Sequence, residues 1–439
     1  MGVTVCKFGG TSLADASQIR KVADIVREDP ARKFVVVSAP GKRFEGDIKV
    51  TDLLLGLEDS ESYEEDYNKV IERFMEMTQE LGIKYDLISG DLEETWDLLR
   101  DSKMEAVVSR GEYICAKIVA AHQGFEFVDA ASFMVFSANG SFDLDATKAR
   151  WERLSLPQAA GYVVPGFYGV MPDGRIKTFS RGGSDFSGAV LSAVIEADVY
   201  ENWTDVSGMF SADPRVVKNP RRIEEITYRE LRELTYMGAT VLHDEVVFPL
   251  QKAGIPIVIK NTNAPYEEGT RIVPDRLAAP KQNGTVVGLA GRKDFTVFTL
   301  EKPLMNQELG FLVSALTVFK VHGVSVEHVP GSIDAVSIIV DGRELEDNKL
   351  ERICEELVVA CGIDRVKVDR EVALICVVGH NMYHTPGCAA DILMAIAIAG
   401  LNTRIINQCA SEMSVMAGVD NKDYEAAMNA IHDRMILKT

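Results

Sequence analysis

The sequence predicts an α/β protein in which a mostly parallel sheet lies between helices and is followed by two small α+β domains. Short runs of β-branched residues alternate with helical patterns through the first part of the chain. Strands that are separated by helices pair in parallel, and the helices cover both faces of the sheet. Proline, asparagine and glycine cluster between residues 274 and 284, which predicts a domain boundary there. Two similar units follow this boundary.

The first elements have a β-α-β pattern. Strand-like runs occupy residues 3–6 and 34–37, and apolar residues recur at helical spacing between them. These helical positions are Ile19, Val22, Ile25 and Val26. Further strands of the sheet are predicted at residues 125–128, 162–164, 176–179 and 255–259.

The C-terminal third contains an internal repeat. Three pairs of residues are separated by the same 77 positions (387 − 310, 400 − 323 and 414 − 337): Gly310 and Gly387, Gly323 and Gly400, and Ser337 and Ser414. Each copy predicts a strand, a helix opened by glycine, and two further strands. One interpretation is a duplicated structural domain, and the other is a pair of ligand-binding modules with a groove at the glycine-opened turn.

The composition is that of a folded, acidic protein. The chain has 439 residues, of which 46% are hydrophobic, and its formal net charge is 47 − 66 = −19. Negative charge repels phosphate backbones and anionic lipids, so we expect neither a nucleic acid nor a membrane as partner. No apolar stretch approaches the roughly 20 residues of a membrane-spanning helix, and we expect a soluble, cytoplasmic protein.

The cysteines do not indicate a disulfide framework or a metal centre. There are seven, scattered and mostly set in apolar runs, which is typical of buried free thiols. The chain has no C-x-x-C pair and no H-E-x-x-H motif, so no metal site built from protein ligands is predicted.

A first motif, K-F-G-G-T-S at residues 7–12, lies between a predicted strand and a predicted helix. The adjacent Gly9 and Gly10 allow backbone N–H groups to approach an anion, and Lys7 adds a full positive charge. The motif is neither a P-loop nor a G-x-G-x-x-G turn. It therefore predicts a phosphate site of another kind, against the alternative of a tight corner between a strand and a helix.

Two further motifs carry polar side chains. S-R-G-G-S-D at residues 180–185 precedes a helix, and its Arg181 can pair with a carboxylate through two parallel N–H bonds. Residues 203–215 begin with Trp203-Thr204-Asp205 at the end of a predicted strand. Ligands of open α/β sheets bind beyond the carboxyl ends of the strands, where both motifs and Lys7 are expected to meet.

These three motifs resemble those of the aspartokinases, a branch of the amino acid kinase superfamily. The family motifs are K-F-G-G-T-S, G-R-G-G-S-D and W-T-D-V-x-G-x-x-x-x-D-P-R, and all three stand here in the same order, with Ser180 in place of one glycine. The C-terminal third resembles a tandem pair of ACT domains, which bind small molecules. The resemblance covers nearly the whole chain.

The resemblance implies an amino acid kinase domain at residues 1–280 and a first ACT domain at residues 300–370. That domain is inserted into a second one, made of residues 285–299 and 371–439. It also implies that the γ-phosphoryl group of ATP, used with Mg²⁺, is transferred to the β-carboxylate of L-aspartate to give 4-phospho-L-aspartate, the first step of lysine, threonine and methionine biosynthesis. Homo-oligomers would form through the ACT domains.

The resemblance further implies roles for individual residues. Lys7 and Asp185 would be catalytic, with Lys7 on the transferring phosphates and Asp185 orienting the lysine or the substrate ammonium group. The nucleotide would be bound by Lys7, Gly9, Gly10, Thr204, Asp205, Phe210 and Arg215. The aspartate would be bound by Ser38, Thr51, Glu112, Phe167, Arg181, Gly182, Ser184 and Asp185. Among these, Arg181 would hold the α-carboxylate and Glu112 the ammonium group.

An inhibitory amino acid is expected at the first ACT domain, with lysine favoured and threonine second, alone or together. The matching positions are Met305, Gln307, Gly310, Phe311, Leu312, Val326, Glu327 and Ser332. An acidic Glu327 beside backbone donors suits an ammonium group.

The chain departs from the family pattern at two positions. Thr240 stands where many members have a lysine near the nucleotide, so phosphate contact is either weaker or supplied elsewhere, for example by Lys260. Phe210 stands where tyrosine is common and keeps the stacking face without the hydroxyl. Two alternatives to an aspartate kinase follow: a kinase for another acidic amino acid, and an inactive amino-acid sensor.

Overall fold

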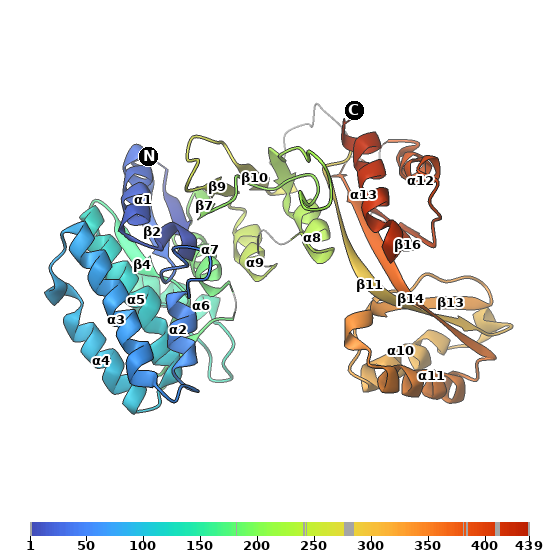
Figure 1. The fold of residues 1–439 in the computed structure, drawn as a ribbon, viewed down its shortest axis with the longest axis horizontal. Coiled ribbons are helices and arrows are strands. Elements are labelled where there is room, and N and C mark those ends of the chain that lie inside the picture. The colour runs from blue at the N-terminus through green and yellow to red at the C-terminus, as the bar shows by residue number, and fades with distance from the viewer. Residues whose placement is uncertain are drawn as a thin grey trace. The chain divides into compact units, whose positions relative to one another are not determined.

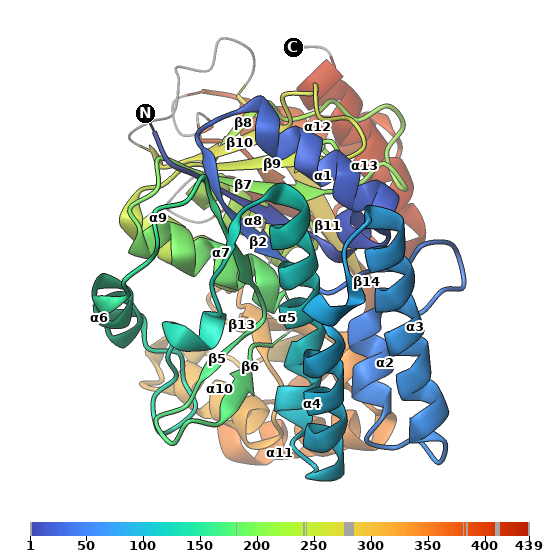
Figure 2. The ribbon, with the colours of Figure 1, turned by 90° about the vertical axis from the view of Figure 1, so that its left-hand side faces the viewer.

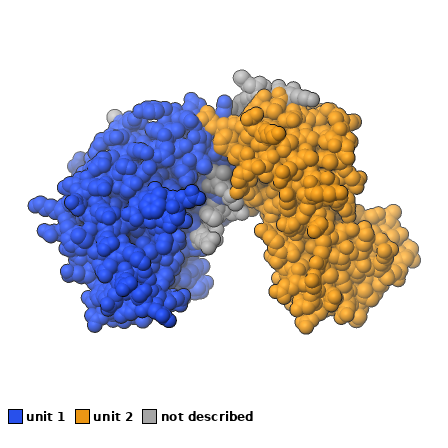
Figure 3. Space-filling view, in the orientation of Figure 1, with its two compact units in different colours: residues 1–209, 224–228, 241–278 blue, residues 210–223, 229–240, 279–439 orange. Residues whose placement is uncertain are grey.

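The computed structural model describes residues 2–180, 182–239, 242, 244–275, 285–380, 382, 385–408 and 413–437. They form two compact units (Figure 3). Unit 1 contains residues 1–209, 224–228 and 241–278, and unit 2 contains residues 210–223, 229–240 and 279–439. Residues 210–223 and 229–240 thus pack with the C-terminal part of the chain, while the predicted domain boundaries themselves stay a prediction.

Unit 1 is built around an eight-stranded sheet with the order β3-β4-β2-β1-β7-β9-β10-β8. Every neighbouring pair is parallel except β9 and β10. The mostly parallel sheet predicted from the sequence is therefore confirmed. Its strands are β1 (Thr4–Phe8), β2 (Arg32–Val37), β3 (Glu126–Phe127), β4 (Tyr162–Pro165), β7 (Val199–Thr204), β8 (Glu225–Thr227), β9 (Ile257–Asn261) and β10 (Thr270–Val273).

Helices cover both faces of this sheet (Figures 1 and 2). Buried residues of α1, α3 and α5 form one core with Cys6 and Phe8 of β1 and Val35 and Val37 of β2. Helix α7 packs on the opposite face, against β1 and β7. The helices that begin in unit 1 are α1 (Ala16–Glu28), α2 (Val50–Gly56), α3 (Tyr63–Leu81), α4 (Ser89–Arg100), α5 (Met104–Gln123), α6 (Leu144–Arg153), α7 (Gly183–Val194), α8 (Tyr228–Tyr236) and α9 (Asp244–Ala253).

One predicted strand of the main sheet lies elsewhere. Strand β6 (Ile176–Thr178) pairs antiparallel with β5 (Tyr168–Val170) in a separate two-stranded sheet. The connection is a short turn in which the Met171 N–H donates to the Arg175 carbonyl at 2.8 Å and Gly174 has a φ of 86°. A connection this short permits only an antiparallel partner, so the prediction that this run joins the parallel sheet was wrong.

Charged side chains are buried where β1, β2 and β7 meet. The Glu201 carboxylate accepts hydrogen bonds from Arg32 Nε at 2.9 Å and Arg32 Nη2 at 3.1 Å. Trp203 Nε1 donates to the same carboxylate at 2.9 Å, and Cys6 Sγ donates at 3.3 Å. Because both charges are buried and paired, the register of three central strands is fixed by one carboxylate.

Unit 2 contains a six-stranded antiparallel sheet with the order β12-β13-β11-β14-β16-β15. Its strands are β11 (Gly288–Glu301), β12 (Val326–His328), β13 (Ala335–Asp341), β14 (Arg365–Val378), β15 (Ile405–Gln408) and β16 (Ser414–Asp420). Its helices are α10 (Phe311–Val321), α11 (Asp347–Cys361), α12 (Cys388–Ile398) and α13 (Tyr424–His432). Strands β11 and β14 each have 14 residues and run through both halves of the sheet.

The 77-residue repeat is confirmed for the helices. Gly310 and Gly387 have φ values of 83° and 91° and cap α10 and α12, and Asp294 and Glu371 kink β11 and β14 at φ values of 69° and 57°. The pairing of Ser337 with Ser414 is wrong. Ser337 pairs with Thr299 in the first copy. The equivalent of Thr299 in the second copy is Cys376, which pairs with Met416. Ser337 therefore corresponds to Met416, and the spacing there is 416 − 337 = 79. Two additional residues therefore lie between Gly400 and the last strand.

The described residues also answer two simpler expectations. None of their helices is long and apolar enough to span a membrane. Six cysteines are free and five of these are buried, while Cys409 lies outside the described residues.

The buried carboxylate generates a stability prediction. Glu201→Ala leaves Arg32 buried without its counter-charge, and we expect a loss of about 3–5 kcal/mol in unfolding free energy. Denaturant unfolding, followed by tryptophan fluorescence because Trp203 lies in the cluster, measures this loss. Asp24→Ala, which breaks an exposed pair with Arg27, is the control and should leave the transition in place. An unchanged midpoint for Glu201→Ala would contradict the role assigned to the cluster.

Candidate active site

A buried ion pair lies at the carboxyl end of the central strands. Lys7 of β1 is only 6% exposed, and its Nζ lies 2.5 Å from Oδ1 of Asp185. Asp185 is the third residue of α7, whose N-terminal cap is Gly182 with a φ of 81°. Anions are favoured at a helix N-terminus, and a buried ammonium group requires a partner. Lys7, Gly182 and Asp185, predicted from two separate motifs, are thus brought together.

Two residues of β7 also hold Asp185. Asn202 Nδ2 donates to Oδ1 of Asp185 at 3.0 Å, and the Tyr200 hydroxyl donates to the Asp185 backbone carbonyl at 3.2 Å. Sequence analysis missed both. The two bonds join residues that are 15 and 17 positions apart, and no local sequence pattern reveals them.

The glycine turn that follows β1 lies close to Lys7. The Gly9 N–H donates to the Trp203 carbonyl at 3.1 Å, which joins the turn to the end of β7. A Cβ atom on Gly9 would lie 3.6 Å from Lys7 Nζ, so the missing side chain leaves space in front of the ammonium group. An anionic group is favoured in this space by the charge of Lys7.

The loop after β2 packs directly on this turn. The Gly41 N–H donates to the Gly10 carbonyl at 2.8 Å, and a Cβ atom on Gly41 would lie 2.5 Å from the Gly10 carbonyl carbon. Only glycine permits such an approach. Ser38 begins this loop and donates its N–H to the Phe8 carbonyl at 3.2 Å. Thr51 follows it, as the second residue of α2.

Arg73 of α3 binds the same loop and was not predicted from the sequence. Its guanidinium group donates to Oδ2 of Asp47 at 3.0 Å, to the Ile48 carbonyl at 3.1 Å and to the Ala14 carbonyl at 3.2 Å. It also donates to the Gly41 carbonyl. A buried arginine that satisfies four acceptors fixes the position of the loop, and no local sequence pattern reveals this long-range role.

Glu112 of α5 is buried beside the loop. A Cβ atom on the preceding Gly111 would lie 2.9 Å from the Ala39 side chain, so the helix approaches the loop closely. Burial raises the pKa of Glu112 to about 8, although the Ala39 backbone and the charge on Lys7 act in the opposite direction. Its Oε2 atom has no hydrogen-bond partner. This carboxyl group is therefore prepared to receive a cationic ligand.

The segment that contains Phe167 packs closely against Ser184. A Cβ atom on Gly166 would lie 2.7 Å from the Ser184 side chain. The next residue, Phe167, has a φ of 78°, a conformation that costs energy in any residue with a side chain. Its N–H donates to Ser187 Oγ at 2.9 Å, which ties this strained turn to α7.

The predicted nucleotide residues divide between the two units. Thr204 is the last residue of β7 in unit 1, and Asp205 follows it; the Thr204 carbonyl accepts the Thr262 N–H at 2.9 Å. Phe210 and Arg215 belong to unit 2, where Asp213 pairs with Arg215 at 2.7 Å. Contact of the last two with a nucleotide stays a prediction.

Three other expectations can be placed. Lys260 Nζ lies 5.1 Å from the centre of the Trp203 ring. Because side chains alternate along strands, Lys260 and Trp203 lie on the face of the sheet opposite Lys7 and Asn202, and phosphate contact by Lys260 stays a prediction. Arg181 and Thr240 lie outside the described residues.

The predicted effector positions lie at one end of the first repeat. Met305 and Phe311 are buried in its core with Val326 packed against them, whereas Leu312 is exposed. A Cβ atom on Gly310 would meet no atom within 4 Å, so the helix opening is accessible. The remaining predicted positions, all at least partly exposed, are Gln307, Glu327 and Ser332.

Glu327 has a partner that the sequence did not predict. Its Oε2 atom accepts a hydrogen bond from the hydroxyl of Tyr236, the last residue of α8. The Tyr236 ring also meets His328 edge-on, with ring centres 6.2 Å apart. The carboxylate expected to receive an effector is thus bound to the helix that precedes the second unit's sheet.

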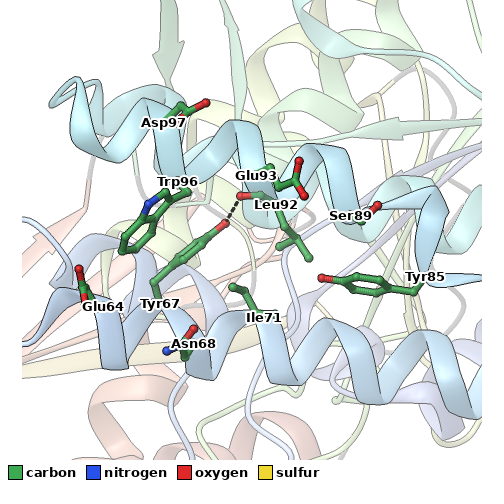
Figure 4. Close-up of a pocket in the computed structure, with 10 residues that line it drawn as sticks. All are labelled: Glu64, Tyr67, Asn68, Ile71, Tyr85, Ser89, Leu92, Glu93, Trp96 and Asp97. Carbon is green, nitrogen blue, oxygen red and sulfur yellow. Dashed lines mark hydrogen bonds between the residues drawn. The ribbon is translucent and has the colours of Figure 1, made fainter.

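A cavity elsewhere in unit 1 is not part of this site. Its volume is about 530 Å³, and it lies between α3 and α4 (Figure 4). The rings of Tyr67, Tyr85 and Trp96 line it, and the Tyr67 hydroxyl donates to the Leu92 carbonyl at 2.7 Å across it. None of the predicted site residues contributes to its walls.

Comparison with known proteins gives consistent matches along the chain. A profile of the amino acid kinase family matches residues 2–261, and a profile of the ACT domain matches residues 375–435. Aspartokinase 3 of Bacillus subtilis (strain 168) is 39% identical, over 98% of this chain and 97% of its own length.

Solved structures with the same fold include the aspartate kinase of Clostridium acetobutylicum, with 40% identity, a TM-score of 0.90, and coverage of 99% of this chain and 100% of that one. Aspartokinase III of E. coli is 25% identical and is covered to 99%, as is this chain. Its complex with aspartate and ADP has a TM-score of 0.74, and its complex with lysine and aspartate has a TM-score of 0.75.

Proposed function

The chain belongs to the amino acid kinase family and within it to the aspartokinases, which phosphorylate a carboxyl group of aspartate, and from this premise we propose how its residues bind, react and respond to an effector. We propose that the γ-phosphoryl group of ATP is transferred to the β-carboxylate of L-aspartate, giving 4-phospho-L-aspartate. This product would supply lysine, threonine and methionine biosynthesis.

The observation that carries this proposal is the buried pair of Lys7 and Asp185 beside the Gly9 turn. It places an ammonium group beside a glycine turn and the N-terminus of α7. A phosphoryl group in transfer spreads negative charge over its oxygens, and positioning and charge neutralisation are the main contributions of the protein. The complex of E. coli aspartokinase III with aspartate and ADP supports the choice of ligands.

No general base is required, because the acceptor carboxylate is already a nucleophile. Lys7 would donate to the transferring oxygens while Asp185 keeps its ammonium group oriented. Mg²⁺ arriving with the nucleotide would neutralise further phosphate charge. The described residues contain no cluster of three or more His, Cys, Asp or Glu side chains that could hold a metal ion, so we propose that the phosphates supply its ligands.

The aspartate would lie between Glu112 and the N-terminus of α7. Glu112 would pair with the ammonium group, which would supply the hydrogen-bond donor that Glu112 Oε2 lacks. Arg181 would hold the α-carboxylate, and Ser38, Thr51, Phe167, Gly182 and Ser184 would shape the remainder of the pocket. A free ammonium group on the substrate explains why a buried acidic side chain is useful here, whereas an acylated amine would leave it unpaired.

We propose that an amino acid regulates the enzyme at the first repeat, with lysine favoured and threonine second. The complex of E. coli aspartokinase III with lysine supports this order. The effector ammonium group would compete with the Tyr236 hydroxyl for Glu327. Association through the second unit is supported by apolar side chains that α10 and α12 expose, at Val313, Val321 and Ile398.

Loss of the ammonium group tests the proposed reaction. Lys7→Ala should lower kcat by about 10²-fold or more, because a donor to the transition state is removed. A coupled assay of ADP release with Mg-ATP and L-aspartate measures this change, with Lys148→Ala, which breaks an exposed pair with Glu196, as the control. Turnover by Lys7→Ala at the rate of the parent enzyme would refute the assignment.

The pH dependence of aspartate binding tests the role of Glu112. Its pKa of about 8 means that the group is protonated at neutral pH, and it must lose that proton to pair with an ammonium group. The KM for aspartate should therefore rise as pH falls below 8, approaching about tenfold per pH unit. Glu112→Gln should raise KM and remove this pH dependence; a variant whose profile matches that of the parent would argue against the pairing.

The effector site is tested by removing its carboxylate. Glu327→Ala should weaken inhibition by lysine at least about tenfold, the lower range expected for loss of a charged partner, and should leave uninhibited kcat nearly unchanged. Tyr236→Phe, which frees Glu327 from its competitor, should shift inhibition to lower lysine concentrations. Inhibition curves for parent and variants measure both effects, and an unchanged curve for Glu327→Ala would exclude this carboxylate from the site.

A further inference from the structure

Strand β7 separates two sets of polar contacts on its two faces. Glu201 and Trp203 point to the side of α1, where Glu201 binds Arg32, Trp203 and Cys6. Tyr200 and Asn202 point to the side of α7 and both bind Asp185. The hydrogen bonds on the first face fix the backbone position of residue 202, so the Asn202 amide is presented to Asp185 from a rigid support.

Asn202 is an unexpected residue at this place. It is 5% exposed, in a strand that pairs on both sides with β1 and β9, and asparagine is depleted in strands. A buried amide costs free energy unless its polar atoms are bonded. Its observed partner is the one carboxylate that also binds Lys7, which points to a role in the reaction centre.

Asp185 Oδ1 has two donors of different kinds. Lys7 Nζ lies 2.5 Å away and carries a charge, whereas Asn202 Nδ2 lies 3.0 Å away and is neutral. Lys7 has three N–H donors and must share them between Asp185 and the phosphate oxygens during transfer. A carboxylate held by Lys7 alone would lose its position as those donors turn toward the phosphate.

We propose that Asn202 is a positioning residue of this reaction, which anchors the Asp185 carboxylate so that Lys7 can turn its donors to the transferring phosphoryl group while Asp185 stays in place. The role rests on the proposed function. The amide is suited to this role because it is a neutral donor. It holds the Asp185 carboxylate without adding a second positive charge that would compete with Lys7 for the negative charge of Asp185.

Two variants of similar shape test this role in the full-length enzyme. Asn202→Leu removes the donor and keeps the approximate volume; we expect kcat to fall about 10- to 100-fold, as for other residues that orient a reacting group, with KM for ATP and aspartate changed less. Asn202→Asp places a second carboxylate beside Asp185. Since two adjacent carboxylates cannot both ionise freely, the acid limb of the kcat profile should move to higher pH.

Ser192→Ala on α7 is the control. It removes one buried neutral hydrogen bond, to the Gly188 carbonyl, about two helical turns from Asp185, and leaves both donors to the Asp185 carboxylate intact. We expect kcat within about threefold of the parent, a typical effect for one neutral hydrogen bond away from the reacting group, and an unmoved pH profile. Circular dichroism and thermal melting establish that each variant is folded.

The outcomes distinguish a positioning role of Asn202 from a purely structural role. They also distinguish failure of that positioning role from failure of the proposed function. A folded Asn202→Leu with the parent kcat overturns the role, as does a loss equal to that of Ser192→Ala. If Asn202→Leu does not fold, Asn202→Asp decides alone, and an acid limb that stays at the parent pH overturns the role. A parent enzyme that releases no ADP with aspartate overturns the proposed function itself, which the variants cannot imitate.

Discussion

The interaction on which the site depends is an ammonium group placed inside the protein. Lys7 lies on a central strand of the mostly parallel sheet, where little of its side chain is exposed to water. Asp185 must therefore be held at contact distance, and the helix that carries it must begin beyond the end of β1. On the opposite face of the sheet, the charge of Arg32 is paired in the same way, with Glu201. Two ion pairs, one on each side of the sheet, thus help to hold β1, β2 and β7 in register.

The site is gathered from segments that are distant in the sequence because their backbones can approach closely. Gly10 touches Gly41, Gly111 touches Ala39, and Gly166 touches Ser184, in each case at a distance that a side chain would prevent. Arg73 then holds the Gly41 loop through acceptors that the backbone supplies. The geometry around Lys7 is consequently set by main-chain contacts, which are stiffer than contacts between long side chains.

The sequence predicted the parts of the protein that local pattern determines. The parallel sheet, the glycine-opened helices and the residues of the three motifs follow from periodicity and from spacing within short segments. Asn202, Arg73 and Tyr236 could not be predicted, because their partners Asp185, Gly41 and Glu327 are fixed only after folding. The antiparallel hairpin of β5 and β6 was missed because no strand was predicted at residues 168–170, so the five-residue connection was not recognised as a hairpin turn. The pairing of Ser337 with Ser414 failed because the repeat is interrupted by two residues, which a fixed period cannot accommodate.

The shared sheet of unit 2 limits how its two repeats can diverge. Strands β11 and β14 pair along nearly their whole length, and each contributes residues to both repeats. Neither repeat therefore has a complete set of strands of its own. Deletion of one copy would leave the other with an unpaired, largely apolar edge that favours aggregation. A duplicated gene segment of this kind is therefore retained as a pair, and its copies are free to change in their helix openings and loops. One copy can change at its helix opening while the other preserves the sheet, so the two openings can diverge without a change of fold.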